Sequence, residues 1–453
     1  MNSTGTGGNL SGNIDYQRTF KKPDKSFTVS YKLDRMPRTS DYGTDIDGQL
    51  NYNSYRQRST NDATGTEHTF QLDYYDPLTK IHQIEGGVKY ILRQNISNSE
   101  VLRYDSLQDT WIRDTSRNND LDYDQHILGI YAGYLLKLKK ISIKTGLRAE
   151  ATINNGTFTS IKDTTFTNRM FNLIPYITLS KNLNKGQNVK FSYTQRLSRP
   201  NIYYLNPYIN DADPLNISFG NPDLKAEVSH TFDMSYGKFA TKYSVNLSGN
   251  AAFTNNTIQS ILTINSAGVR STTYQNTGKN QRFGGYLYGS LRPNSKLTLN
   301  TNVNINYSVL ESGDSRNLKN EGFNYSGSLN LRYVAWKNGT VSGYIGFYSP
   351  RIMLQGQSGS YYFSNLSLSQ ELFKKKLMLT ASLTDPFRER MILETNLKDP
   401  SFNSKSASYM YLRMVRINLS YRFGQMKSQI KKAKRSIKNE DVKAGEESST
   451  GTQ

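Results

Sequence analysis

The residues best suited to binding chemistry lie in one aromatic, proline-rich stretch near the middle of the chain. Tyr203, Tyr204 and Tyr208 lie close in sequence to Asp211 and Asp213. Aromatic rings stack on sugars or planar chelates, and carboxylates accept hydrogen bonds. We therefore predict that these five residues contact a ligand. The alternative is that the neighbouring prolines and asparagines only fix the local conformation, since both residue types favour turns.

No arrangement of residues predicts catalysis or a metal site. The four histidines, His68, His82, His126 and His230, are far apart, and none has another at metal-ligand spacing. The chain has no cysteine, which excludes thiolate ligands and disulfide bonds. Phosphate-binding glycine patterns and a hydrolase Ser/His/Asp order do not stand out either. We predict a protein that is not an enzyme and uses no metal or cofactor.

Amphipathic strands flank the aromatic stretch. Apolar and polar side chains alternate along residues 189–194 and again along 232–236. The alternation is most regular at 297–309, where the apolar residues are mostly odd-numbered and the polar ones mostly even-numbered. This period of two is typical of strands with one apolar face. The longest apolar run, 127–136, is too short for a spanning helix, which needs about 18 residues.

The composition favours a wall one residue thick over a large soluble core. Hydrophobic residues make up only 36% of the chain, and the mean hydropathy is −0.67. A barrel with apolar residues outside and polar residues inside needs no more than this. The net charge of +20 comes from basic residues scattered between strands. That dispersal predicts contact with membrane lipid and lipopolysaccharide headgroups, and no nucleic-acid partner.

The connections between the expected strands alternate in length, and this alternation is typical of an outer-membrane barrel, which has short turns on one rim and long loops on the other. We predict an all-β fold: a transmembrane, antiparallel, up-and-down β-barrel with about 17 strands. The short turns are 22–25, 76–79, 138–140, 182–187, 292–295, 336–339 and 373–376; the long loops are 37–66, 94–122, 199–225 and 385–405.

The barrel is expected to occupy residues 1–424. Residues 425–453 are poor in hydrophobics and rich in Lys, Glu, Ser and Gly, so we expect a disordered basic tail on the periplasmic side. An odd number of strands would put Met1 outside the cell, whereas such barrels generally have an even number. We therefore expect that upstream strands are missing and that the barrel is incomplete. The start of the chain also has no secretory signal.

Short motifs lie in the middle of the chain and at its end. The middle carries Arg199-Pro200, Leu205-Asn206-Pro207, Asp213-Pro214 and the run 220–227; the end carries Ser420-Tyr421-Arg422-Phe423-Gly424, then a basic segment and Ile437-Lys438-Asn439-Glu440-Asp441. Together they resemble the outer-membrane β-barrel family of TonB-dependent receptors. The resemblance extends over nearly the whole chain. Ala226 differs, because the family often has proline there. The residues that match the family's midpoint signature, to which the resemblance gives a structural role, are Arg199, Pro200, Asn206, Pro207, Asp213, Pro214, Gly220, Asn221, Pro222, Leu224 and Glu227.

The resemblance implies a bacterial outer-membrane protein. Such receptors have about 22 strands around an N-terminal plug, and they import iron chelates, cobalamin, glycans or peptides with energy relayed by the TonB complex. A surface lipoprotein is a further possible partner. The sequence shows no plug or TonB box, so the expected function is the barrel portion of such an importer. The alternatives are a passive porin or adhesion barrel without a plug, then a barrel enzyme, then a soluble glycan-binding protein.

Overall fold

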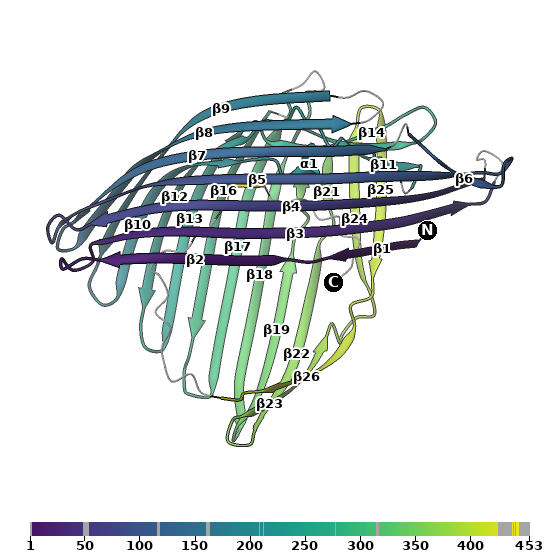
Figure 1. The fold of residues 1–453 in the computed structure, drawn as a ribbon. Coiled ribbons are helices and arrows are strands. Elements are labelled where there is room, and N and C mark those ends of the chain that lie inside the picture. The colour runs from purple at the N-terminus through teal and green to yellow at the C-terminus, as the bar shows by residue number, and fades with distance from the viewer. Residues whose placement is uncertain are drawn as a thin grey trace.

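One long antiparallel sheet makes up most of the molecule. The computed structural model describes residues 2–48, 54–115, 118–159, 164–207, 209–211, 213–276, 278–313, 317–424, 437, 439 and 441–443. Within these residues the main sheet has 19 strands, each paired antiparallel with its neighbours. Figure 1 shows the sheet curled round, so that the purple and blue N-terminal strands pass in front of the green C-terminal ones. The all-β barrel architecture predicted from the sequence is confirmed.

The wall of the barrel consists of strands that follow one another in chain order. Two of the 19 strands are extensions: β1 (Asn2–Gly7) pairs with β3 beyond β2, and β6 (Thr110–Arg113) pairs with the end of β5. The other 17 agree with the predicted number. They are β2 (Leu10–Thr19), β3 (Ser26–Ile46), β4 (Tyr55–Asp76), β5 (His82–Asp105), β7 (Asn119–Lys137), β8 (Ile141–Thr159), β9 (Thr164–Asn182), β10 (Gln187–Ser198), β12 (Glu227–Phe239), β13 (Tyr243–Asn255), β16 (Lys279–Leu291), β17 (Leu297–Glu311), β18 (Lys319–Trp336), β19 (Gly339–Tyr348), β22 (Tyr361–Leu372), β23 (Leu377–Thr384) and β26 (Met414–Tyr421).

The two ends of the wall are sheet edges. Among the described strands, β2 and β26 each pair on one side only and not with each other. Their apolar side chains are correspondingly open: Ile14 of β2 is 73% exposed and Ile417 of β26 is 72% exposed, against 44% for Leu128 inside the wall. Because strands alternate in direction, the first and last of 17 run the same way. An antiparallel closure therefore needs further strands between these edges.

The outer face is apolar, as the alternation predicted. Ile305 of β17 is 49% exposed, whereas Ser308 of the same strand is 8% exposed and lies on the polar inner face. Aromatic rings continue the outer surface from strand to strand, and Phe253 makes edge-on contacts with Phe232 and Phe283 at centroid distances of 6.3 and 5.7 Å. A lipid environment would cover these side chains, which explains their exposure in the protein alone.

Two rims are distinguished by the length of their connections. Short turns join β2 to β3, β4 to β5 and the later hairpins, and in Figure 1 they lie along the left and lower edges. The long connections contain the remaining elements. These are α1 (Ile202–Leu205), a sheet of β11 (Asn216–Ser218), β15 (Arg270–Asn276) and β14 (Ile258–Ile264), and a sheet of β20 (Ile352–Met353), β21 (Gly356–Ser358), β24 (Met391–Asp399) and β25 (Phe402–Met410).

Two predicted loops are wrong. Most of 37–66 belongs to β3 and β4, and much of 94–122 belongs to β5 and β7, so these hairpins continue far past a bilayer-spanning length. One face of these extensions is buried, but it is largely polar, as at Gln57, Ser59 and Ser97. Such strands need no apolar alternation, because polar cross-strand pairs suffice. One example is the Thr39 hydroxyl, which donates to Asp62 at 2.6 Å. A search for apolar alternation therefore overlooks such strands.

Candidate functional site

Residues 199–227, here called the midpoint segment, fold back on themselves through backbone hydrogen bonds. Asn201 begins α1, and its side chain accepts a hydrogen bond from the Tyr204 amide at 3.3 Å. Farther along the segment, the Gly220 amide donates to the Asn206 carbonyl at 2.8 Å, and the Asn221 amide donates to the Tyr204 carbonyl at 2.6 Å. A Cβ on Gly220 would lie 2.5 Å from the Asn206 carbonyl oxygen. Only glycine fits this close approach of two backbones.

The midpoint segment is fixed by a hydrophobic cluster. Tyr204 is 1% exposed, and its ring lies edge-on to Tyr274 of β15 at a centroid distance of 4.7 Å. Such contacts hold the segment against strands of the wall, since apolar burial is the main stabilising force in a folded chain. The cluster consists of Leu121, Tyr123, Phe158, Tyr204, Leu205, Leu224, Ile258 and Tyr274, with Ile202 packed against it.

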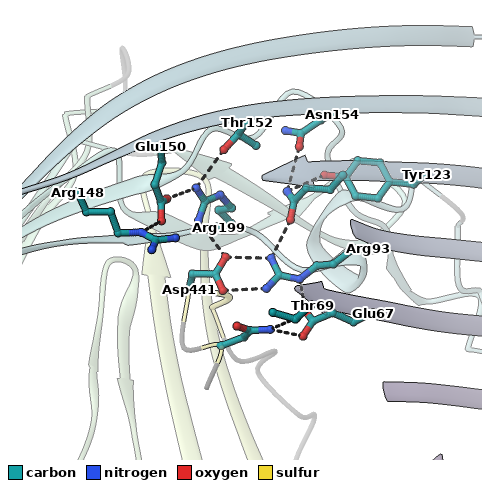
Figure 2. A network of polar contacts seen from close by, with 12 residues as sticks. Glu67, Thr69, Arg93, Tyr123, Arg148, Glu150, Thr152, Asn154, Arg199 and Asp441 are labelled. Atoms are coloured by element: carbon teal, nitrogen blue, oxygen red, sulfur yellow. Dashed lines mark hydrogen bonds and ion pairs between the residues drawn. The ribbon is translucent and has the colours of Figure 1, made fainter. Parts of the chain in front are cut away.

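A network of buried charges lies next to this cluster, and it is centred on Arg199 (Figure 2). Arg199 directly follows β10 and is 1% exposed. Its Nη2 donates to the Glu150 carboxylate at 2.7 Å and to the Thr152 hydroxyl at 3.1 Å, both on β8. Glu150 also accepts a hydrogen bond from Arg148. A buried charge is tolerated when partners of opposite sign satisfy it, and Glu150 does this for Arg199.

Arg93 of β5 is the second guanidinium of the network. It is 8% exposed. Its Nη1 donates to the side-chain oxygen of Gln125 on β7 at 2.8 Å, and its Nε donates to Glu67 on β4. The strands that carry Arg93 and Arg199 are not neighbours, because β7, β8 and β9 lie between them. The curvature of the wall therefore brings the two guanidinium groups together.

Asp441, near the end of the chain, joins the two guanidinium groups. Arg93 donates to both carboxylate oxygens of Asp441, at 2.8 and 2.9 Å, and Arg199 donates to one of them at 2.9 Å. Figure 2 shows the Asp441 carboxylate between both arginines. Paired, charge-assisted bonds of this kind are roughly twice as strong as neutral ones. Asp441 lies within the tail that the sequence predicted to be disordered, and this contact was not expected.

The described part of the tail, residues 437, 439 and 441–443, is here called the tail strand. Asn439 donates to Glu67 at 2.5 Å and to the Thr69 hydroxyl at 2.8 Å. The Lys443 ammonium donates to the Glu227 carboxylate and to the Ile258 carbonyl, both at 2.6 Å. The tail strand is thus bonded along its length to the inner side of the barrel. These contacts do not test the predicted domain boundary at residue 424, which stays a prediction.

The tail strand supplies one of the three carboxylates that face the arginines of the network. Arg93, Arg148 and Arg199 face the carboxylates of Glu67, Glu150 and Asp441. Burial disfavours the charged form of Asp441, but the hydrogen bonds from Arg93 and the charges of Arg93 and Arg199 outweigh this effect. They hold the pKa of the Asp441 carboxyl well below its usual range. Asp441 is therefore ionised at neutral pH.

The predicted ligand-binding residues occupy different surroundings. Tyr203 is 49% exposed, whereas Tyr204 is 1% exposed within the hydrophobic cluster. Asp211 is buried and accepts a hydrogen bond from Gln57 at 3.1 Å. Asp213 accepts from the Leu215 amide at 3.0 Å and so fixes its own turn. Tyr208 lies outside the described residues. Ligand binding by this set stays a prediction.

The residues that match the midpoint signature have contacts that fit a structural role. The Asn221 side chain donates to the Tyr274 carbonyl at 2.8 Å, and Glu227 accepts from the Ile258 amide at 2.6 Å. Pro200 and Pro222 line a small cavity beside Arg199. The other members are Asn206 and Gly220, bonded as described above, Leu224 in the cluster, Pro207 two residues after the end of α1 and Pro214 in the turn fixed by Asp213.

Each histidine bonds to a tyrosine of a neighbouring strand. His68, His126 and His230 lie 2.9, 2.7 and 3.0 Å from the hydroxyl groups of Tyr31, Tyr90 and Tyr193, and His82 contacts Tyr134. Among the described residues no three His, Asp or Glu side chains converge as metal ligands. The described part of the chain also has no helix long and apolar enough to cross a membrane.

Sequence reasoning named Arg199 but did not name the other five charged members of the network as site residues: Glu67, Arg93, Arg148, Glu150 and Asp441. The available signal was a charge within an amphipathic strand at a position facing inward, as at Arg93 and Glu150. Such a charge needs a partner when it is buried. The identity of the partner could not be read, because Arg93 and Asp441 are separated by 348 residues.

A model of the outer membrane protein beta-barrel family matches residues 18–421. The search of curated proteins gave no match. Among solved structures, the chain is similar to the copper transporter OprC (11% identity, TM-score 0.69), to the siderophore receptor PiuA from Acinetobacter baumannii (13%, 0.66) and to the ferric citrate transporter FecA (12%, 0.63). These likenesses cover 92–93% of this chain and 62–66% of the others, so the chain spans about two thirds of their length.

Proposed function

The chain belongs to the outer membrane protein β-barrel family of the bacterial outer membrane, and we propose that it is the barrel portion of an energised importer for a large nutrient. The nutrient class would be an iron chelate, a glycan or a peptide. The observation that carries this proposal is the barrel fold that 92–93% of the chain shares with the copper transporter OprC, the siderophore receptor PiuA and the ferric citrate transporter FecA. The proposal assigns binding and passage to the chain and no catalysis.

The barrel's interior supports this role. The inner wall carries buried charges such as Arg93, Glu150 and Arg199, and a long midpoint segment enters from the rim of long connections. The ring of Tyr203 is exposed, and we propose that it contacts the nutrient together with its sequence neighbours Asp213 and Tyr208. Iron chelates and sugars both present flat or hydroxyl-rich surfaces that such groups bind.

The proposed partners follow from the proposed role. A plug domain in the lumen and the TonB complex would supply gating and energy, and a surface lipoprotein could deliver the nutrient. The apolar outer face would contact membrane lipid, and basic residues near the strand ends would contact lipopolysaccharide. The proposed domain division is a barrel over residues 1–424 and a basic periplasmic tail over residues 425–453.

Uptake and conductance test the proposal together. A strain that lacks the gene is expected to lose growth on one nutrient class, offered as an iron chelate, a glycan or a peptide, and to regain it with the gene restored. The purified chain in planar bilayers is expected to give no steady, wide conductance. A steady, wide conductance together with unimpaired uptake in the deletion strain would favour a passive porin and overturn the proposal.

A further inference from the structure

The side chains of the tail strand match the inner wall in order. Asn439 bonds to Glu67, Asp441 to Arg93 and Arg199, and Lys443 to Glu227. These are alternate residues, as expected for an extended peptide with one face on the wall. The wall presents an acid, then two bases, then an acid, and the peptide presents an amide donor, an acid and a base. This order gives both affinity and register.

We propose that the inner wall contains a binding site for an extended peptide that carries a carboxylate, and that the tail strand of the same chain (residues 437, 439 and 441–443) is its resident, displaceable ligand. The site consists of Glu67, Arg93, Arg199 and Glu227. This inference does not depend on the proposed transport, because it concerns what the lumen binds and not what crosses it.

The site is held by wall residues, so it does not depend on the tail for its shape. Glu150 and Thr152 fix Arg199, and Glu67 and Gln125 fix Arg93. Both guanidinium groups are at least nine-tenths buried and directed at the same carboxylate. When the carboxylate leaves, two buried guanidinium groups lose an acceptor and the wall carries an excess of positive charge. A carboxylate on a peptide is the ligand that restores the balance.

Backbone hydrogen bonds add a component that does not depend on side chains. The Arg199 amide donates to the Asp441 carbonyl at 2.7 Å, and the Lys443 amide donates to the Arg199 carbonyl at 2.8 Å. Addition of a peptide strand to an exposed backbone is a common mode of peptide recognition. The Lys443 ammonium also lies 5.9 Å from the centre of the Tyr204 ring. The ligand is therefore a peptide and not a free carboxylate.

The docked peptide holds both ends of the midpoint segment. Asp441 is bonded to Arg199 at its start, and Lys443 is bonded to Glu227 at its end. Occupancy of the site and the position of the midpoint segment are therefore coupled. Release of the peptide would remove a restraint at both ends of the segment.

Disulfide trapping tests whether the tail of the same chain occupies the site. The chain has no cysteine of its own, so Thr69→Cys with Asn439→Cys introduces one possible pair. The matched control pairs Asn439→Cys with Ser308→Cys, since Ser308 lies on the polar face of β17 and is bonded to Asn324 of β18. In the full chain in outer-membrane vesicles, the first pair is expected to oxidise within one chain and the control is not. A disulfide only between chains, or equal oxidation of both pairs, would overturn the proposal.

Binding of a separate peptide is a second test of the site. In the full-length Asp441→Arg variant the tail would be repelled by Arg93 and Arg199, so the site would be vacant. A fluorescent peptide with the sequence of residues 436–444 is expected to bind this variant at least about 10-fold more tightly than the unchanged chain, whose site is filled. Equal binding to both, or no binding to a folded Asp441→Arg variant, would contradict the proposal.

Two further measurements separate recognition from nonspecific charge attraction. The same peptide with Asn in place of the Asp at position 441 is expected to bind Asp441→Arg about 10-fold more weakly, because the charge-assisted bonds are lost. In a variant that combines Arg93→Gln with Asp441→Arg, the unaltered peptide is expected to bind more weakly than to Asp441→Arg alone, by a similar factor. The unfolding midpoint of each variant shows that it is folded. Unchanged affinity in both cases would exclude Arg93 and the peptide carboxylate as partners.

Discussion

Arg93 and Arg199 donate to the same oxygen of Asp441, each at 2.9 Å. Arg93 lies on β5 and Arg199 directly follows β10, and three strands separate β5 from β10. The shared acceptor makes the carboxylate a bridge across the curved wall. Removing either arginine leaves the other bonded, whereas removing the carboxylate affects both. The network should accordingly respond more strongly to changes at Asp441 than to changes at one arginine.

Glu150→Gln should destabilise the barrel by removing the wall partner of Arg199. Removing one partner of a buried ion pair lowers the free energy of unfolding by about 3–5 kcal/mol. Arg199 would keep Asp441 as its remaining carboxylate partner, so we expect a loss of about 3 kcal/mol. The measurement is the urea unfolding midpoint in lipid vesicles. The control is Glu394→Gln, whose partner Lys405 is well exposed and whose loss should cost about 1 kcal/mol or less. Equal effects would contradict the burial argument.

Acidification should release the tail strand. The pKa of the Asp441 carboxyl is lowered when the tail is docked, whereas a free aspartate carboxyl has a pKa of about 4. The undocked state therefore takes up the proton more readily, and docking weakens as the pH falls below about 4. A fluorophore on a cysteine at Asn439 should report increasing mobility in that range. Glu67 and Glu150 also contact the arginines, so Asp441→Asn is needed as a reference; the same pH profile in that variant would refute the assignment.

Gly220→Ala should disturb the midpoint segment. The added Cβ would lie 2.5 Å from the Asn206 carbonyl oxygen and 2.7 Å from the Tyr204 carbonyl oxygen. Overpacking of this kind costs about 1–3 kcal/mol. At Gly249, by contrast, the nearest atom to an added Cβ is 3.8 Å away, so Gly249→Ala is the matched control. Thermal unfolding in detergent should separate the two variants, and an unchanged melting temperature for Gly220→Ala would show that the close approach is not required.

Tyr203 and Tyr204 should differ in the effect of truncation. Tyr204→Ala removes a ring from the hydrophobic cluster and should cost about 3–5 kcal/mol. Tyr203→Ala removes an exposed ring and should leave stability within about 1 kcal/mol. If Tyr203 contacts the nutrient, its loss should instead weaken uptake in the complemented strain. Stable protein with normal uptake after Tyr203→Ala would remove it from the predicted binding set.

The sequence predicted the strands that cross the membrane because lipid imposes a pattern on them. Residues 297–309 show that pattern, and β17 (Leu297–Glu311) follows it with Ile305 outside and Ser308 inside. The alternation of short and long connections was equally readable, since it reflects the direction of each strand. The far ends of β3, β4 and β5 were missed because their buried positions are largely polar, as at Thr44, Gln57 and Ser97.

The charged site could not be predicted for a different reason. Its charged members come from β4, β5 and β8, from the start of the midpoint segment and from the tail. A single sequence does not show which distant charges meet. Asp441 and Lys443 lie in a polar, basic segment whose composition is that of a disordered chain. The contacts of the tail depend on the curvature of the wall and not on local preference. The role of Tyr204 was obscured similarly, because its partner Tyr274 belongs to a different connection.

The central claim is a wall with lipid outside and a polar lumen inside, and single cysteines on one strand test it most directly. Ile305 and Asn306 are neighbours on β17 and face opposite sides. In membrane vesicles of the full chain, a water-soluble maleimide should label Asn306→Cys and spare Ile305→Cys, whereas a fluorophore at 305 should be quenched by brominated lipid and one at 306 should not. The reverse pattern, with lipid contact at 306 and water access at 305, would contradict the account.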